Sequence, residues 1–300
     1  MVDTAGNEHG GPLISMISRN KGIFSLEFIV PAIGFVISLL IVEPIFALYV
    51  RPRAEEIALK QRVMAAQGGI TGRGSEERSL VVIIKDPEQE FEIVFALWGF
   101  IILGYKLAQI RKERRLFKHD FVRLQPGERI IPDDALDRYK DMRGAIEREP
   151  KWQSRLLPEC MLAALHRFHA TNSIQDAANA IKERADLAAD ELDSSLSLVR
   201  YIAWAIPAIG FIGTVRGIGL ALSFAEDAIK GDISPVTAAL GLAFNSTLVA
   251  LIISMVLMYV MHLVQSRQEA FVIETQIYCR DKLIDVMKVP ASEQNAGSFA

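Results

Sequence analysis

The chain has 300 residues, of which 51% are hydrophobic and 23% charged, with a formal net charge of −3. This composition is too apolar for an ordinary water-soluble domain of this length, and the weak negative charge does not predict a nucleic-acid partner. The two cysteines, Cys160 and Cys279, lack CxxC spacing and the partners of a disulfide framework, so we expect free thiols. The class to test first is therefore the integral membrane proteins.

Several segments are long and apolar enough to cross a bilayer, whose hydrocarbon core takes about 20 helical residues. We therefore predict an all-α polytopic membrane protein with four transmembrane helices. The predicted spans are residues 23–50, 91–110, 201–227 and 236–265. Basic residues gather just after the second span, which places that end and both chain termini on the cytoplasmic side of the membrane. Arg51 and Arg53 disagree with this topology, because they follow the first span on the outer side.

The segments between the spans complete the predicted topology. They are a cytoplasmic leader (1–22), a periplasmic loop (51–90), a cytoplasmic helical domain (111–200), a short periplasmic link (228–235) and a cytoplasmic helix with a disordered tail (266–300). The cytoplasmic domain is expected to break near Pro126, Pro132 and Pro158. Ser173 is a suitable N-cap, and apolar residues then recur every three or four positions. That stripe predicts one long helix running into the third span.

The third and fourth spans each carry a stripe of small residues that contains one threonine. The stripes are Ala203, Pro207, Gly210, Thr214, Gly217 and Ala221, and then Ala243, Thr247, Ala250 and Ser254. Small residues allow another helix to approach closely. The two threonines then have two interpretations: they line a shared path, or they only pack helices and bond to carbonyls of their own helices.

Two strings in these spans resemble a known family. Residues 207–218 read PAIGFIGTVRGI and residues 243–251 read AFNSTLVAL. The first resembles the Pro-x-x-Gly-x-x-Gly-Thr-Val-x-Gly-Ile signature of the TolQ and ExbB branch of the MotA/TolQ/ExbB proton channel family. The second is similar to the threonine motif in that branch's last span. Arg216 stands where the branch usually has tryptophan or an apolar residue, Leu242 stands where ExbB-type proteins have an acidic residue, and the span count is that of MotA.

The resemblance implies the ring subunit of an inner-membrane, ion-driven motor or energy-transducing channel, in which H⁺ or Na⁺ flux does mechanical work on a partner. It also implies a homo-pentamer in the membrane lipid around a dimer of a single-span TolR-, ExbD- or MotB-like protein, whose membrane aspartate carries the ion. Thr214 and Thr247 would belong to the ion pathway. Pore lining and packing against the partner helix would fall to Pro207, Gly210, Gly217, Ala221, Ala243, Ala250 and Ser254. The alternative function is a non-conducting membrane scaffold of the same fold that assembles a partner complex.

Arg216 lies inside the third span, where a charged side chain is costly and is normally paired. It occupies the opposite side of the helix from Thr214, so it is expected to point away from the pore. Glu43 lies at a similar depth in the first span and is the expected partner in a structural ion pair, with Glu92 as a second choice. A role in setting the field at the ion entrance is the competing interpretation.

Nothing in the spans predicts an enzyme or a cofactor, because they contain no histidine-rich cluster, paired carboxylates or nucleophile beside a base. The glycine-rich residues 68–74 lack the Lys-Ser/Thr ending of a phosphate-binding loop. His166 and His169, with Cys160 upstream, could supply three metal ligands, but a fourth is not evident. A packed or solvated helix surface is the favoured interpretation of these residues, and no metal site is predicted.

Overall fold

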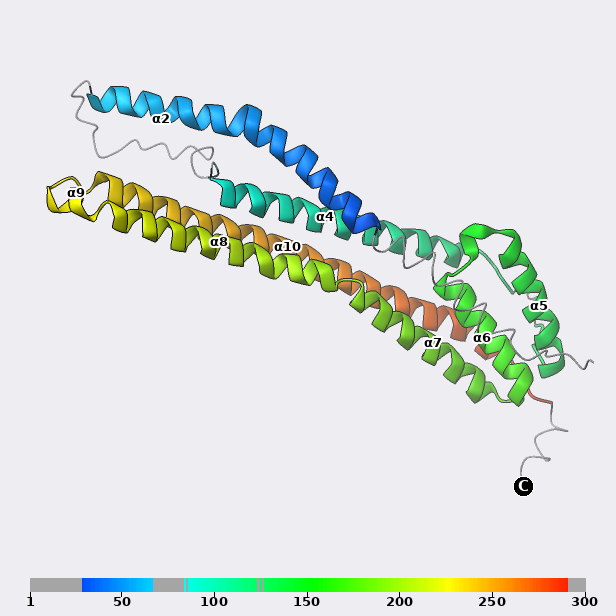
Figure 1. Cartoon of the computed structure of the whole chain (residues 1–300). Helices are drawn as coiled ribbons and strands as arrows, with labels where there is room; N and C mark the ends of the chain where they lie inside the picture. Colours follow the sequence, from blue (N-terminus) through cyan, green and yellow to red (C-terminus); the bar gives the residue numbers. More distant parts are fainter. Residues whose placement is uncertain (1–28, 67–83, 85, 123–124, 126, 291–300) are drawn as a thin grey trace, which may run out of the picture. The chain divides into compact units, whose positions relative to one another are not determined.

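A computed structural model of the chain describes residues 29–66, 84, 86–122, 125 and 127–290 (Figure 1). The described residues form helices and no strand. Four helical stretches are long and apolar enough to cross a membrane: Ile29–Ile57, Pro87–Lys118, Ile174–Ser223 and Ser234–Val286. The chain is thus an all-α, multi-pass membrane protein, as predicted. The expected leader (1–22), the glycine-rich residues 68–74 and the expected disordered tail (291–300) lie outside the described residues.

The chain divides into two compact units, each built from segments that are far apart in the sequence. Unit 1 comprises Met1–Ile102 and Val199–Met258, and unit 2 comprises Leu103–Leu198 and Tyr259–Ala300. The helices of unit 1 are residues 29–45, a π-helical turn Phe46–Val50, α2 (Arg51–Ala66), the first part of α4 (Pro87–Arg114), α8 (Ser197–Ser223), α9 (Ala225–Ile229) and the first part of α10 (Ser234–Lys282).

Helix α2 corrects one prediction, since residues 51–66 are helical where a loop was expected. The segment contains no glycine and is rich in residues with high helix propensity, so it is helical although its charged composition led us to expect a loop. Pro52 is tolerated near its start because the chain widens into the π-helical turn just before it, where the Arg51 N–H bonds to the Phe46 carbonyl. The apolar span therefore continues into a polar helix without a turn.

The helix over residues 29–45 packs against α4. The indole N–H of Trp98 donates to the Pro31 carbonyl at 2.8 Å, and the rings of Phe35 and Trp98 lie 5.0 Å apart. Further along, Val42 and Phe46 form a buried cluster with Val94. These contacts place α4 directly beside the first span.

Unit 2 has a core of large apolar side chains. Its helices are the end of α4, a 3₁₀ turn Arg115–Lys118, α5 (Pro132–Arg148), a 3₁₀ turn Pro150–Trp152, α6 (Leu156–Thr171), α7 (Ile174–Ser194), the end of α10 and a 3₁₀ turn Ile284–Val286. One face of α6 buries Leu157, Met161, Leu165 and Phe168. The predicted breaks near Pro132 and Pro158 are confirmed, because each proline lies in the first turn of a helix. Pro126 lies outside the described residues.

Ser173 caps α7, and its hydroxyl accepts the Asp176 N–H at 3.2 Å, as the sequence predicted. The prediction of a single long helix from this cap into the third span is wrong in one detail. A turn at Ser195 and Leu196 separates α7 from α8. The Ser195 hydroxyl donates to the Leu192 carbonyl at 2.7 Å, which offers the backbone an alternative to helical bonding.

Candidate functional site

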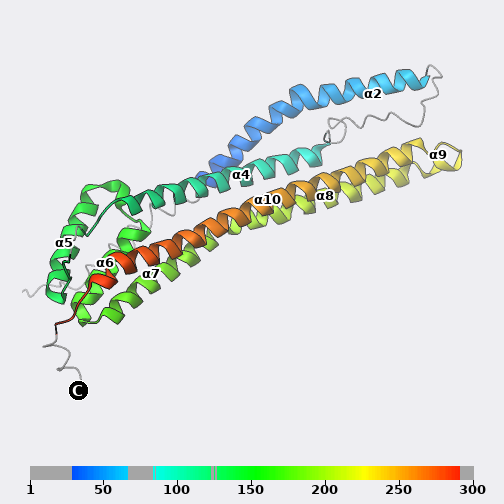
Figure 2. The ribbon, with the colours of Figure 1, turned by 180° about the vertical axis from the view of Figure 1, so that it is seen from behind.

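Helices α8 and α10 lie side by side and are joined through α9 (Figures 1 and 2). They approach each other closely where glycines of α8 meet alanines and a serine of α10. A Cβ atom at Gly210 would lie 2.5 Å from the Cβ of Ala250, and one at Gly217 would lie 2.6 Å from the Cβ of Ala243. Both separations are too short for real carbon atoms. The helix that the small stripe of α8 admits is therefore α10 of the same chain.

We call the contact between α8 and α10 the α8–α10 seam. The residues predicted to line the pore or to pack against a partner helix lie in this seam. Gly210, Gly217, Ala221, Ala243, Ala250 and Ser254 are buried, and Pro207 is half-buried. Ser254 also bonds across the seam, since its hydroxyl donates to the Ala203 carbonyl at 2.7 Å. The contacts observed for these residues are within one chain, and the lining of a path by any of them stays a prediction.

The seam brings the two predicted threonines together. The hydroxyls of Thr214 and Thr247 are in hydrogen-bond contact. The Thr214 hydroxyl also lies 3.1 Å from the Ala243 carbonyl, and the Thr247 hydroxyl donates to the Gly210 carbonyl at 3.0 Å. Both side chains are half-buried, so each keeps an open side. The pair is thus hydrogen-bonded to both helices, and its oxygen atoms remain partly exposed at the edge of the α8–α10 contact.

The predicted ion pair between Arg216 and Glu43 is wrong. The Arg216 guanidinium donates to the Glu88 carboxylate at 2.7 Å. The reason lies in the helix order of unit 1: α4 packs against the α8–α10 hairpin, as the contact of Gly99 with Leu257 and Ile202 shows. Arg216 therefore joins α8 to the second span rather than to the first.

Glu43 lies instead beside Glu90, near the start of α4. Glu90 pairs with Arg51 at 2.7 Å. Arg53 lies over the ring of Tyr49, with its guanidinium carbon 5.1 Å from the ring centre. The two arginines that disagreed with the predicted topology are thus both held by contacts within unit 1.

Several polar side chains are buried near the start of α4 and on α10, and sequence reasoning considered only Glu92 among them, as a second-choice partner of Arg216. Glu92 has no exposed surface and neither carboxyl oxygen has a hydrogen-bond partner. The amide nitrogen of Gln89 and the hydroxyl of Ser246 are also buried without a partner. A signal was present in the sequence, because Glu92 lies inside the predicted span 91–110, where an acidic residue is expensive.

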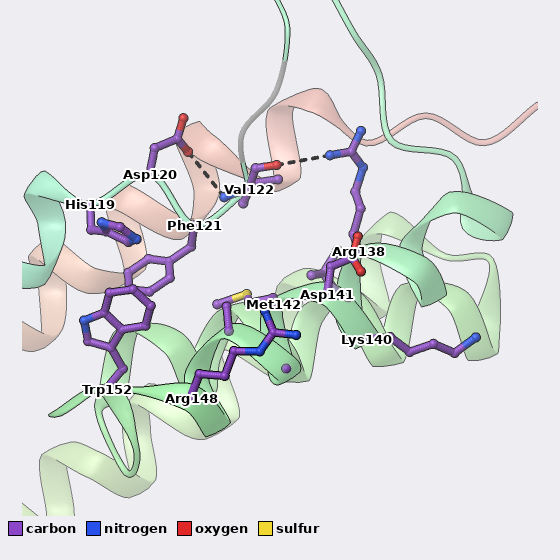
Figure 3. A pocket seen from close by; sticks show the side chains of 13 residues that line it. His119, Asp120, Phe121, Val122, Arg138, Lys140, Asp141, Met142, Arg148 and Trp152 are labelled. Atoms are coloured by element: carbon purple, nitrogen blue, oxygen red, sulfur yellow. Dashed lines mark hydrogen bonds between the residues drawn. The ribbon is translucent and has the colours of Figure 1, made fainter. Parts of the chain in front are cut away.

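Unit 2 contains a pocket that the sequence did not predict. Figure 3 shows His119, Phe121 and Trp152 grouped at one end, with ring centres of His119 and Trp152 4.5 Å apart, and Arg138 at the other end. Arg138 donates to the Val122 carbonyl at 3.1 Å. Lysine and arginine share the wall with Asp120 and Asp141, so charge favours neither anions nor cations and assigns no ligand.

The histidines considered as metal ligands have protein contacts. His169 Nδ1 lies 3.0 Å from the Pro132 carbonyl, and the ring of His166 packs 5.6 Å from that of Tyr139. Within the described residues, no group of three histidine, cysteine or acidic side chains could hold a metal ion.

Comparison with known proteins adds one finding. Residues 153–277 match the family model described as the MotA/TolQ/ExbB proton channel family. The match takes in all of α6, α7, α8 and α9, and α10 as far as Ile277, so it includes both threonines. No curated protein and no solved structure gives a significant match. The first span and α4 lie outside the matched residues.

Proposed function

We propose that this chain, whose residues 153–277 match the model of the MotA/TolQ/ExbB proton channel family, is the ring subunit of an ion-driven motor in a bacterial inner membrane. Flux of H⁺ or Na⁺ through the ring would be coupled to mechanical work on a partner. The observation that carries the proposal is the threonine pair, Thr214 and Thr247, which lies inside the matched residues and in contact across the α8–α10 seam.

The chemistry of this pair suits an ion path. A hydroxyl oxygen has two lone pairs and one proton, so it can accept from a protonated carboxyl or coordinate a dehydrated cation. The carbonyl contacts fix both hydroxyls in place, while partial exposure leaves an oxygen surface for a passing group. In this proposal the two hydroxyls contact the ion, or the protonated carboxyl, that the partner's aspartate carries past them.

The proposed assembly is a homo-pentamer around a dimer of a single-span TolR-, ExbD- or MotB-like protein, with both termini of the chain in the cytoplasm. Proteins of this family work with single-span partners in membrane complexes. The exposed surface of unit 1 supports contact with lipid or other helices, since large apolar side chains such as Trp204, Phe244 and Met255 are about 70% exposed.

One observation favours a second candidate, a non-conducting scaffold of the same fold. The threonine hydroxyls already bond to each other and to carbonyls of both helices. A purely structural seam needs nothing more than these contacts.

Ion flux into membrane vesicles distinguishes the two functions. The chain is co-expressed with its single-span partner, and the native complex is compared with the Thr214→Val/Thr247→Val double variant. Valine keeps the side-chain volume and removes both hydroxyls, so we expect flux to fall at least tenfold while the complex still assembles. Running the assay with Na⁺ and H⁺ gradients in turn identifies the ion.

Thr275→Val is the matched control, because Thr275 lies on the same helix with its hydroxyl bonded to the Phe271 carbonyl at 2.9 Å. It should conduct like the native chain. An assembled native complex without flux would favour the scaffold. Full flux in the double variant would show that the two threonines are not part of the ion path.

A further inference from the structure

The start of α4 holds a carboxyl group that differs from every other on that helix. Glu88 pairs with Arg216, Glu90 with Arg51 and Glu113 with Arg155. Among the residues that the structure describes, Glu92 has no such cation and no hydrogen-bond partner for either oxygen, and its side chain is fully buried. We propose that Glu92 is a proton-binding site of this chain, held as a neutral carboxylic acid between α4 and the α8–α10 hairpin.

The position of Glu92 follows from the register of the helices. Glu88 lies against Gly213 beside Ser246, and Gly99 lies against Leu257. The separation from Glu88 to Gly99 on α4 equals that from Ser246 to Leu257 on α10, so these stretches run side by side. Glu92 lies one turn beyond Glu88 and two turns before Gly99, on the same face of α4.

That register places Glu92 level with Ala250 on α10. Ala250 in turn packs against Gly210 of α8. Glu92 is therefore buried against the hairpin at the depth of the threonine pair, but it comes from a helix outside the family match.

The charges around Glu92 favour its neutral form. An isolated buried carboxylate is far more costly than a buried acid, and it is normally neutralised by a partner or a proton. Glu88 faces the same side and adds a like charge, while its own partner Arg216 is already engaged at 2.7 Å. Glu90, Glu43 and Arg51 form a separate group beside the first span. On α10 the residues that face this part of α4 are not ionisable.

The surrounding oxygen atoms favour a proton over a metal cation. Hard cations in proteins take about six oxygen ligands, whereas a proton needs one. Among the described side chains where α4 faces α10, the carboxyl of Glu92 and the hydroxyl of Ser246 have oxygen atoms without a partner, and the unpartnered Glu90 oxygen belongs to the group beside the first span. Ser246 lies beside Glu88, one turn from the level of Glu92, so these oxygen atoms do not complete a cation shell.

Infrared spectroscopy of the full chain with its partner in lipid nanodiscs tests this proposal directly. A protonated carboxyl has its own carbonyl stretch, distinct from that of a carboxylate. At pH 7 we expect this band in the native complex and a weaker band in Glu92→Gln. The matched control is Glu113→Gln, which removes a half-buried carboxylate of the same helix that is paired with Arg155. The control should keep the full band intensity.

Three outcomes would overturn the proposal. One is a native complex without a protonated-carboxyl band at pH 7, where an exposed glutamate with a pKa of about 4.3 is ionised. The spectrum of the native complex needs no variant, so a folding defect in Glu92→Gln does not prevent the test. The second is an unchanged band in an assembled Glu92→Gln complex. The third is loss of the band when NaCl is added at constant pH, which would show that Na⁺ displaces the proton and that the site binds a cation. None of these depends on ion flux, so the test is independent of the proposed motor function.

Discussion

The two units of the chain place their large apolar side chains in opposite ways. In unit 1 the α8–α10 seam is built from glycine, alanine and serine, while Trp204, Leu222 and Met255 are each 70% exposed. In unit 2 the interior holds Leu157 and Phe168 with no exposed surface. Ion pairs follow the same division, because Arg216 and Glu88 meet between spans, whereas Lys140 and Asp137 pair on an open surface.

This difference shows that each unit is built for its own solvent. Lipid tails are as apolar as leucine, so helices in a bilayer associate through close packing and polar contacts rather than through burial of large side chains. In water the hydrophobic effect drives large side chains inside. The contrast supports a membrane setting for unit 1 and an aqueous one for unit 2, and it can be tested with matched substitutions.

The largest expected effect comes from placing the same charge on each surface. Leu248 of α10 and Leu187 of α7 are 56% and 57% exposed, so they differ in surroundings rather than in burial. A lysine near the middle of a span costs about 2.5–3.5 kcal/mol, whereas a lysine on a water-exposed helix changes stability by about 0.5 kcal/mol or less. We expect Leu248→Lys to reduce the inserted, folded chain strongly and Leu187→Lys to leave it unchanged.

The measurement is the fraction of full-length chain recovered folded from membranes, together with its thermal unfolding midpoint. Equal losses in the two variants would mean that both leucines meet an apolar environment. That result would place α7 against lipid or a protein partner and break the assignment of unit 2 to water.

A smaller effect is expected from widening the α8–α10 seam. Gly217→Val adds a branched side chain where a Cβ would already lie 2.9 Å from the Cα of Ala243, so the backbones must separate. Overpacking of this kind costs about 1–3 kcal/mol. Gly219→Val is the control, because a Cβ at Gly219 has nothing within 4 Å. Unfolding midpoints in detergent compare the two variants. A control that is as damaging as Gly217→Val would show that valine itself, rather than the seam, causes the loss.

The smallest effect concerns an exposed carboxylate of unit 2. The Gln125 N–H donates to Glu128 at 2.8 Å, and this hydrogen bond, followed by the charge of Arg138, lowers the pKa of Glu128. A lowered pKa stabilises the fold above the ordinary value of about 4.3 and loses that contribution as the pH falls through the lowered value. Hydrogen exchange in α5 should therefore be slightly faster in Glu128→Gln than in the native chain at about pH 6.

The difference between these two proteins should vanish at about pH 2, where the native carboxylate is protonated as well. A difference that persists in acid would assign the effect of Glu128→Gln to lost packing rather than to charge.

Much of the fold could be predicted because it depends on local properties. Hydropathy over about 20 residues locates a span whatever its neighbours, and helical periodicity showed that Thr214 and Thr247 lie in small stripes. The Ser173 cap is a contact between residues three apart, so it was visible in the sequence as well. The turn at Ser195 and the helical start of the expected loop at Arg51 were missed, because short-range bonding decided them against the wider pattern.

The sequence by itself thus determined an all-α membrane protein, its apolar spans, the match of residues 153–277 to a family model and the stripes that hold the threonines. Only the tertiary structure decided which helices are neighbours. It paired Arg216 with Glu88 instead of Glu43, and it left Glu92 buried without a cation. The physical reason is that depth along a span can be counted in the sequence, whereas the order of helices around a bundle depends on packing between segments far apart in the chain.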